Sequence, residues 1–176
     1  IMSGHNKWSQ IKRKKEATDA KKSQVFSRLV KEISVQAKLA GGNTSSPGLA
    51  TAIKKARDAN MPADNIERAI KKGTDSKENM EHILYEGYAP GGIGVVVEAL
   101  TANRNKASQE VRHIFAKHGG ALGAQGSVTW GFEKNDDGWT PTMTVPADDE
   151  TLEILSKIVD ELEESEEVQE VFTNAE

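Results

Sequence analysis

The hydrophobic pattern of this 176-residue chain changes its period once, at the polar residues 74–81. Before that stretch, apolar residues recur at three- and four-residue spacing, which is typical of amphipathic helices. After it, β-branched and aromatic runs alternate with shorter helical stripes. A chain of this length can bury one sizeable core or two small ones, and the sharp change of composition near Gly73 favours two. The prediction is a helical domain over residues 1–73, a linker over residues 74–81 and an α/β domain over residues 82–176.

Three helices are predicted in the first domain. The first covers roughly residues 19–39, and the glycine pair 41–42 ends it. Pro47 and Pro62 each occupy a position typical of the first turn of a helix, so each is expected to open one. The third helix is expected to end just before Gly73, which would follow it as a left-handed cap.

The second domain is predicted to have the element order ββαββαβ. This order indicates the α+β class, with an antiparallel sheet covered by helices on one face in a ferredoxin-like layer. The helices are expected over residues 105–117 and directly after the capping pair Asp148-Asp149. The strands are expected over residues 82–88, 93–100, 127–133, 139–146 and 168–173.

Charge is divided unevenly along the chain. Residues 1–72 hold 16 of the 23 Lys and Arg residues but only six acids, which gives about +10. The other 104 residues carry 7 basic and 21 acidic groups, about −14. A basic region joined to an acidic one suggests that the first meets a polyanion while the second maintains solubility or meets another partner.

The cations are densest near the N-terminus. Phosphates supply counter-charge to such a run and release condensed counterions on binding. A solvated basic tail is the alternative, but the cluster continues into the next predicted helix, which favours nucleic-acid binding. Trp8 lies inside the run, either to stack on a base or to anchor the arm to its own domain. The candidate cations are Lys7, Lys12, Arg13, Lys14, Lys15, Lys21, Lys22 and Arg28.

A second candidate site lies in the acidic half, at residues 103–106. Arg104 and Lys106 stand at the predicted start of a helix, where free N–H groups and the helix dipole favour an anion. Together they could clamp a phosphate. An ordinary loop with a polar cap explains the same residues equally well.

Catalytic and metal-binding patterns are scarce. The chain has no cysteine, which excludes a thiolate nucleophile, a disulfide and a Cys-ligated zinc site. His113 and His118 are five residues apart and so do not share one helix face as a zinc-binding pair would. We therefore expect no enzyme activity, no cofactor and no metal. No apolar run reaches membrane-spanning length, and no signal-peptide core is present, so we expect a cytoplasmic protein without a membrane partner.

Several segments, taken in order, resemble the YebC/PmpR family, which includes the mitochondrial translational activator of cytochrome c oxidase subunit I. They are SGHNKW (3–8), IKRKK (11–15), DAKK (19–22), NMPADNIERAI (60–70), YEGYAPGG (85–92), NRN (103–105) and GSV (126–128). The resemblance implies an N-terminal helical domain and two α/β domains, one inserted in the other. The insertion would enter near residues 133–137, where this sequence has only a turn, so the inserted domain is expected to be missing.

The resemblance also implies a non-enzymatic regulator of gene expression that binds nucleic acid. It would act on promoter DNA as a transcriptional regulator, on ribosomal RNA as a ribosome-associated translation factor, or on both. Cations spread over an arm and several helices suit shaped RNA better than a major-groove reader, whereas the family's naming favours transcription. The alternative is a protein-interaction adaptor that uses the acidic α/β domain. Oligomeric state is left open.

Overall fold

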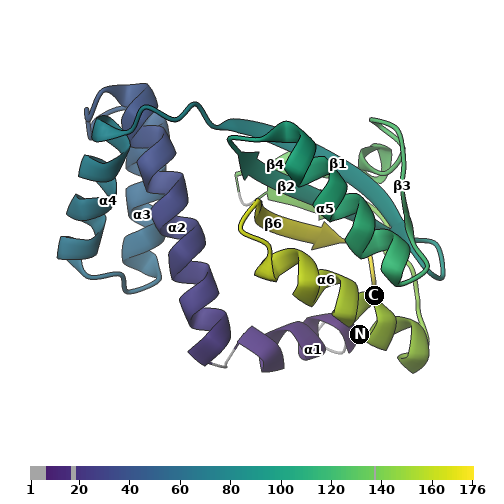
Figure 1. Cartoon of the computed structure of the whole chain (residues 1–176). Coiled ribbons are helices and arrows are strands. Elements are labelled where there is room, and N and C mark those ends of the chain that lie inside the picture. Colours follow the sequence, from purple (N-terminus) through teal and green to yellow (C-terminus); the bar gives the residue numbers. More distant parts are fainter. Residues whose placement is uncertain (1–6, 17–18, 137) are drawn as a thin grey trace. The chain divides into compact units, whose positions relative to one another are not determined.

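The computed structural model describes residues 7–16, 19–136 and 138–176, except for the side chains of residues 15, 16, 19 and 20. Its contacts divide the chain into two compact units (Figure 1). The helical unit is Glu16–Asn79, and the α/β unit combines Met80–Glu176 with the segment that ends at Lys15. Residues 3–6 of the family-like motifs, and Asp137 at the expected insertion point, lie outside the described residues.

The helical unit is built from three helices whose apolar stripes share one core. Ile33, Leu49 and Ile66, one from each helix, are at most 5% exposed, and small residues such as Ala37 and Ala56 let the helices approach closely. At the end of the first helix, Gly42 adopts a positive φ of 84°, as the predicted glycine stop requires. The helices are α2 (Asp19–Ala40), α3 (Pro47–Asp58) and α4 (Ala63–Asp75), which confirms the three predicted helices.

Gly73 does not cap α4 as predicted, because the helix continues past it to Asp75. The residue is buried and faces α2, where the Ser34 hydroxyl donates a hydrogen bond of 3.0 Å to the Ala69 carbonyl. A Cβ atom added at Gly73 would lie closer than 3.0 Å to the Ser34 carbonyl oxygen, a distance that real Cβ atoms essentially never show. Glycine is therefore present here because the two backbones meet.

The α/β unit contains a four-stranded sheet in which every pairing is antiparallel. Its strand order is β3-β1-β2-β6, with Tyr85 of β1 opposite Val97 of β2. Helices α5 and α6 cover one face of this sheet (Figure 1). The predicted α+β class is thereby confirmed. The bounds are β1 (Glu81–Ala89), β2 (Ile93–Thr101), α5 (Arg104–Lys117), β3 (Ala121–Leu122), α6 (Asp149–Glu164) and β6 (Val168–Thr173).

The other face of the sheet is covered by a separate hairpin, β4 (Phe132–Asn135) and β5 (Gly138–Pro141), with the 3-10 turn η2 (Thr129–Gly131) before it. Val95 and Val97 of β2 pack under the helices, whereas Val96 packs against Phe132. Because both faces are covered, β2 is a nearly continuous apolar run instead of an alternating one.

Two predicted strands differ from the structure. Residues 127–131 do not form a strand, because the backbone N–H groups of Val128 and Thr129 bind the carboxylate of Glu86 instead of a neighbouring strand. The strand predicted over residues 139–146 ends at Pro141. Further along, Val145 makes only an isolated parallel bridge to Ala175. The two-residue strand β3 was not predicted.

The N-terminal basic run forms a helix, α1 (Lys7–Glu16), that belongs to the α/β unit. Trp8 is 8% exposed within the core formed by α5, α6 and the sheet, and Ile11 packs against the same core. The sequence-based boundary at residue 73 had grouped this segment with the helical domain instead. Within the described ranges, no helix is long and apolar enough to cross a membrane.

Candidate nucleic-acid interface

Helix α1 buries one side and presents cations on the other. Its buried side is fixed by Trp8, whose backbone N–H donates to the Glu176 carbonyl at 3.4 Å. Lys7 lies 2.9 Å from the Asp149 carboxylate, so Asp149 already offsets its charge. Arg13 and Lys14 are exposed. Their charges face solvent, where a phosphate backbone can reach them.

The other two predicted cations of α1 are Lys12 and Lys15. Lys12 is half-buried, one turn from the Trp8 anchor. Lys15 lies in the helix, but its side chain falls outside the described part of the chain. Trp8 itself is an anchor, because a base could stack on its indole only if the side chain left the core. It anchors the helix to the α/β unit, not to the helical domain that the sequence indicated.

The remaining predicted cations of the N-terminal half lie on α2. Lys22 is exposed, whereas Lys21 and Arg28 are half-buried and take part in interactions of their own. The outer faces of α3 and α4 add exposed cations that the predicted site left out. They lie opposite the buried stripes of their helices, where the helical period of the sequence places them. These additional residues are Lys55, Arg57, Lys71 and Lys72.

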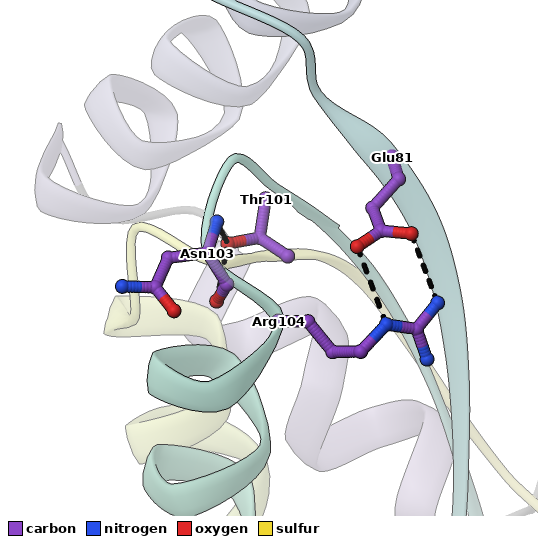
Figure 2. Close-up of polar contacts among 4 residues, drawn as sticks. All are labelled: Glu81, Thr101, Asn103 and Arg104. Carbon is purple, nitrogen blue, oxygen red and sulfur yellow. Dashed lines mark hydrogen bonds and ion pairs between the residues drawn. The ribbon is translucent and has the colours of Figure 1, made fainter.

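Arg104 and Lys106 lie at the start of α5, and both are already paired with carboxylates. The Arg104 guanidinium donates to the two Glu81 carboxylate oxygens at 3.3 and 2.9 Å (Figure 2). Hydrogen bonding and charge attraction from Glu81 raise the pKa of Arg104 further. Lys106 lies 3.4 Å from Glu167. These pairs reduce the positive charge that this site can offer to a phosphate.

The loop before α5 is closed by its own polar groups. The Asn103 side chain accepts a hydrogen bond of 3.1 Å from the Lys106 backbone N–H and so caps the helix. The Asn103 backbone N–H donates to the Thr101 hydroxyl at 2.9 Å (Figure 2). Of the two explanations considered for residues 103–106, this geometry supports the capped loop.

Changing Arg104 and Lys106 together to Gln is expected to alter nucleic-acid affinity by less than about twofold, because both cations are neutralised within the unit. Fluorescence anisotropy with a labelled DNA duplex and a labelled RNA hairpin would measure this. Arg112→Gln, on the exposed side of the same helix, serves as the control. A loss of tenfold or more on either ligand, without loss of fold, would restore the phosphate clamp.

Comparison with known proteins identifies relatives along the whole chain. Residues 6–76 match the family model described as the TACO1/YebC protein N-terminal domain. Residues 80–137 match the model described as the TACO1/YebC second and third domain. A crystal structure of a conserved hypothetical protein from Aquifex aeolicus is similar, with a TM-score of 0.77 and 36% identity over 90% of this chain and 91% of that one.

Curated relatives share the name "Probable transcriptional regulatory protein". The one from Desulfosudis oleivorans is 49% identical over an alignment of 180 residues with gaps. This alignment covers 99% of this chain and 72% of the relative. The one from Trichlorobacter lovleyi is 57% identical over 136 residues, which cover 76% of this chain and 55% of the relative. The matched regions thus span 55% of one relative and 72% of the other.

Proposed function

Because the chain belongs to the TACO1/YebC family, we propose that it is a non-enzymatic, nucleic-acid-binding regulator of gene expression that holds its ligand mainly through the phosphate backbone. The names of its relatives support a regulatory role. The chemistry that the candidate ligands share is a phosphodiester backbone. Promoter DNA and ribosomal RNA both carry it, and the experiment below separates them.

The exposed cations of α1 carry this proposal. Arg13 and Lys14 face solvent on a helix whose position is fixed by the buried Trp8. An anchored helix loses less conformational freedom on binding than a loose tail does. The helical unit adds Lys71 and Lys72 on the outer face of α4. Such contacts release counterions and position a backbone, but they carry no base information.

Neutralising Lys12, Arg13, Lys14 and Lys15 together to Gln is expected to weaken binding to all sequences alike. If these cations contact about four phosphates, the slope of log affinity against log salt should become shallower by about 3 to 4 on duplex DNA. The ratio of wild-type to variant affinity should therefore shrink by about 10²-fold between 50 and 200 mM salt. Anisotropy titrations between 50 and 200 mM salt, on a promoter-length duplex and a ribosomal RNA fragment, would measure both effects.

The matched control removes four cations elsewhere in the α/β unit, with Arg112, Lys117, Lys134 and Lys157 changed to Gln. It changes net charge equally but should leave most of the salt slope intact. An unchanged slope in the α1 variant, or a loss confined to one sequence, would contradict the phosphate-contact model. If the wild-type protein showed no salt-sensitive binding to either nucleic acid, the result would favour the alternative of a protein-interaction adaptor. Crosslinking after co-sedimentation with ribosomes would distinguish ribosomal RNA from promoter DNA as the ligand.

A further inference from the structure

The α/β unit exposes two large apolar side chains on backbone segments that a hydrogen bond joins. Trp130 is 72% exposed and Met143 is 69% exposed. The Thr142 backbone N–H and hydroxyl both donate to the Gly131 carbonyl, at 2.9 and 3.0 Å. This contact joins the residue before β4 to the residue after β5, so Trp130, within η2, and Met143, directly after Thr142, lie on neighbouring backbone segments.

Trp130 differs from the other two tryptophans of the chain. Trp8 is in the core, and Trp139 donates its indole N–H to Glu98 at 3.1 Å while Lys134 lies over its ring at 5.2 Å. Both of those rings have evident structural partners. The Trp130 ring is mostly in water, although burying an aromatic side chain is strongly favourable.

The backbone that carries Trp130 is held in place. Glu86 accepts hydrogen bonds from the N–H groups of Val128 and Thr129, at 3.0 and 2.7 Å, immediately before Trp130. Gly131, immediately after it, is held by Thr142. A partner that covers Trp130 would therefore lose little free energy to ordering the protein. Tryptophan anchors on rigid backbone are typical of the residues that dominate binding at protein interfaces.

Charge indicates what kind of partner fits this surface. Residues 80–176 carry 19 acidic and 6 basic side chains, the unit's other Lys and Arg residues lie on α1, and Glu133 and Asp136 are exposed on the β4–β5 hairpin. Lys134, the cation between them in sequence, already contacts Trp139 and lies 3.6 Å from Glu98. A nucleic acid stacking on Trp130 would bring its phosphates towards this acidic surface. A basic protein segment would gain attraction from it.

We propose that Trp130 and Met143 form a docking surface for a basic protein segment, which places an apolar side chain against the two and directs Lys or Arg towards Glu133 and Asp136. This surface is separate from the cations of α1, because α1 packs into the core on the helix side of the sheet whereas the β4–β5 hairpin covers the other face. The α/β unit would thus use its hairpin face for a protein partner and the cations of α1 for nucleic acid. The proposal does not depend on which nucleic acid the protein binds.

The experiment selects random 12-residue peptides, displayed on phage, for binding to the full chain. Counter-selection uses Trp130→Ser/Met143→Ser, which should keep its fold because both side chains are exposed. The expected outcome is a set of peptides that combine Lys or Arg with apolar residues. The best of these should bind the double variant about 30-fold more weakly, which corresponds to the roughly 2 kcal/mol of an interface hot spot.

Two controls locate the effect. Leu39→Ser removes an equally exposed apolar side chain from the helical unit and should leave peptide affinity unchanged. Glu133→Gln/Asp136→Asn should weaken binding several-fold and reduce its salt dependence. The proposal would be overturned if no peptide were enriched, or if the enriched peptides were acidic. It would also be overturned if the wild-type chain self-associated and the Trp130/Met143 variant did not, because the surface would then bind a second copy. Protection of Trp130 from acrylamide quenching by a single-stranded oligonucleotide would overturn it as well, because the ring would then bind nucleic acid.

Discussion

Replacing Glu86 with Ala is expected to lower the free energy of unfolding of the α/β unit by about 3–5 kcal/mol. The Glu86 side chain is buried on β1, and its carboxylate accepts backbone N–H groups from Gly126, Val128 and Thr129. Alanine would leave these three donors without their partner and open a cavity beneath the segment. Glu86→Gln keeps the shape of the side chain but removes its charge, and the side-chain NH₂ group would face backbone N–H donors. We therefore expect a loss of stability that is smaller than the loss in Glu86→Ala.

Fluorescence during urea unfolding would measure this loss selectively, because Trp8, Trp130 and Trp139 all belong to the α/β unit. Far-ultraviolet circular dichroism reports the helices of both units, so a transition seen by dichroism but not by fluorescence would belong to the helical unit. Glu133→Ala, an exposed acid on the β4–β5 hairpin, is the control and should change stability by less than about 0.5 kcal/mol. A loss in the Glu86→Ala variant no larger than in this control would contradict the anchoring role.

The same carboxylate makes stability depend on pH. Burial alone raises the pKa of Glu86, but hydrogen bonds from Gly126, Thr129 and Val128 outweigh it and lower that pKa below the usual 4.5. Because the pKa is lower in the folded state, the stabilisation is fully present above pH 4.5 and is lost as the pH falls through the folded value. In Glu86→Gln this part of the acid-induced destabilisation should be absent.

Gly73→Ala is expected to destabilise the helical unit by about 2 kcal/mol. The sign of the stability change is informative. Alanine is the better helix former by about 1 kcal/mol, so it would stabilise α4 if the added methyl group met no neighbouring atoms. Here the new methyl group would overlap with the backbone carbonyl of Ser34, which cannot rotate away as a side chain could. The expected loss therefore reflects the close approach of α2 and α4.

Gly48→Ala in α3 is the matched control. A Cβ atom there would meet only the end of the flexible Gln36 side chain, which can move. This variant should be neutral or slightly stabilising. Thermal unfolding followed by circular dichroism would compare the two variants. Stabilisation by Gly73→Ala would show that the contact between the two helices is looser than the structure indicates.

Local patterns in the sequence predicted much of the fold. The apolar stripes of α2, α3, α4, α5 and α6 have the helical period, and the Ala89–Ile93 connection has the glycines and proline of a hairpin turn. Each of these signals acts within a few residues of the element it determines. The resemblance to the YebC/PmpR family was likewise carried by short motifs, and the family comparisons confirm it.

Features that depend on distant contacts were not predictable in this way. A glycine near a helix end is usually a cap, and only the presence of Ser34 across the interface shows that Gly73 has another role. Glu86 is an acid in a strand, and its sequence neighbours give no sign that residues 126–129 bind it. Trp8 and Ile11 do share a helix face, so their spacing could have revealed α1 as a packed helix, although not the unit on which it packs.

The packing of α1 also has a consequence for synthesis of the chain. Lys7 and its partner Asp149 are 142 residues apart, with the helical unit and most of the sheet between them. At roughly 5–20 residues per second, the ribosome makes Asp149 about 7–30 s after Lys7. During that interval the helical unit can fold from local contacts, while Trp8 and the cations beside it have no docking site. The α/β unit therefore completes its core late, and the N-terminal segment is the part most exposed to premature nucleic-acid capture or proteolysis before translation ends.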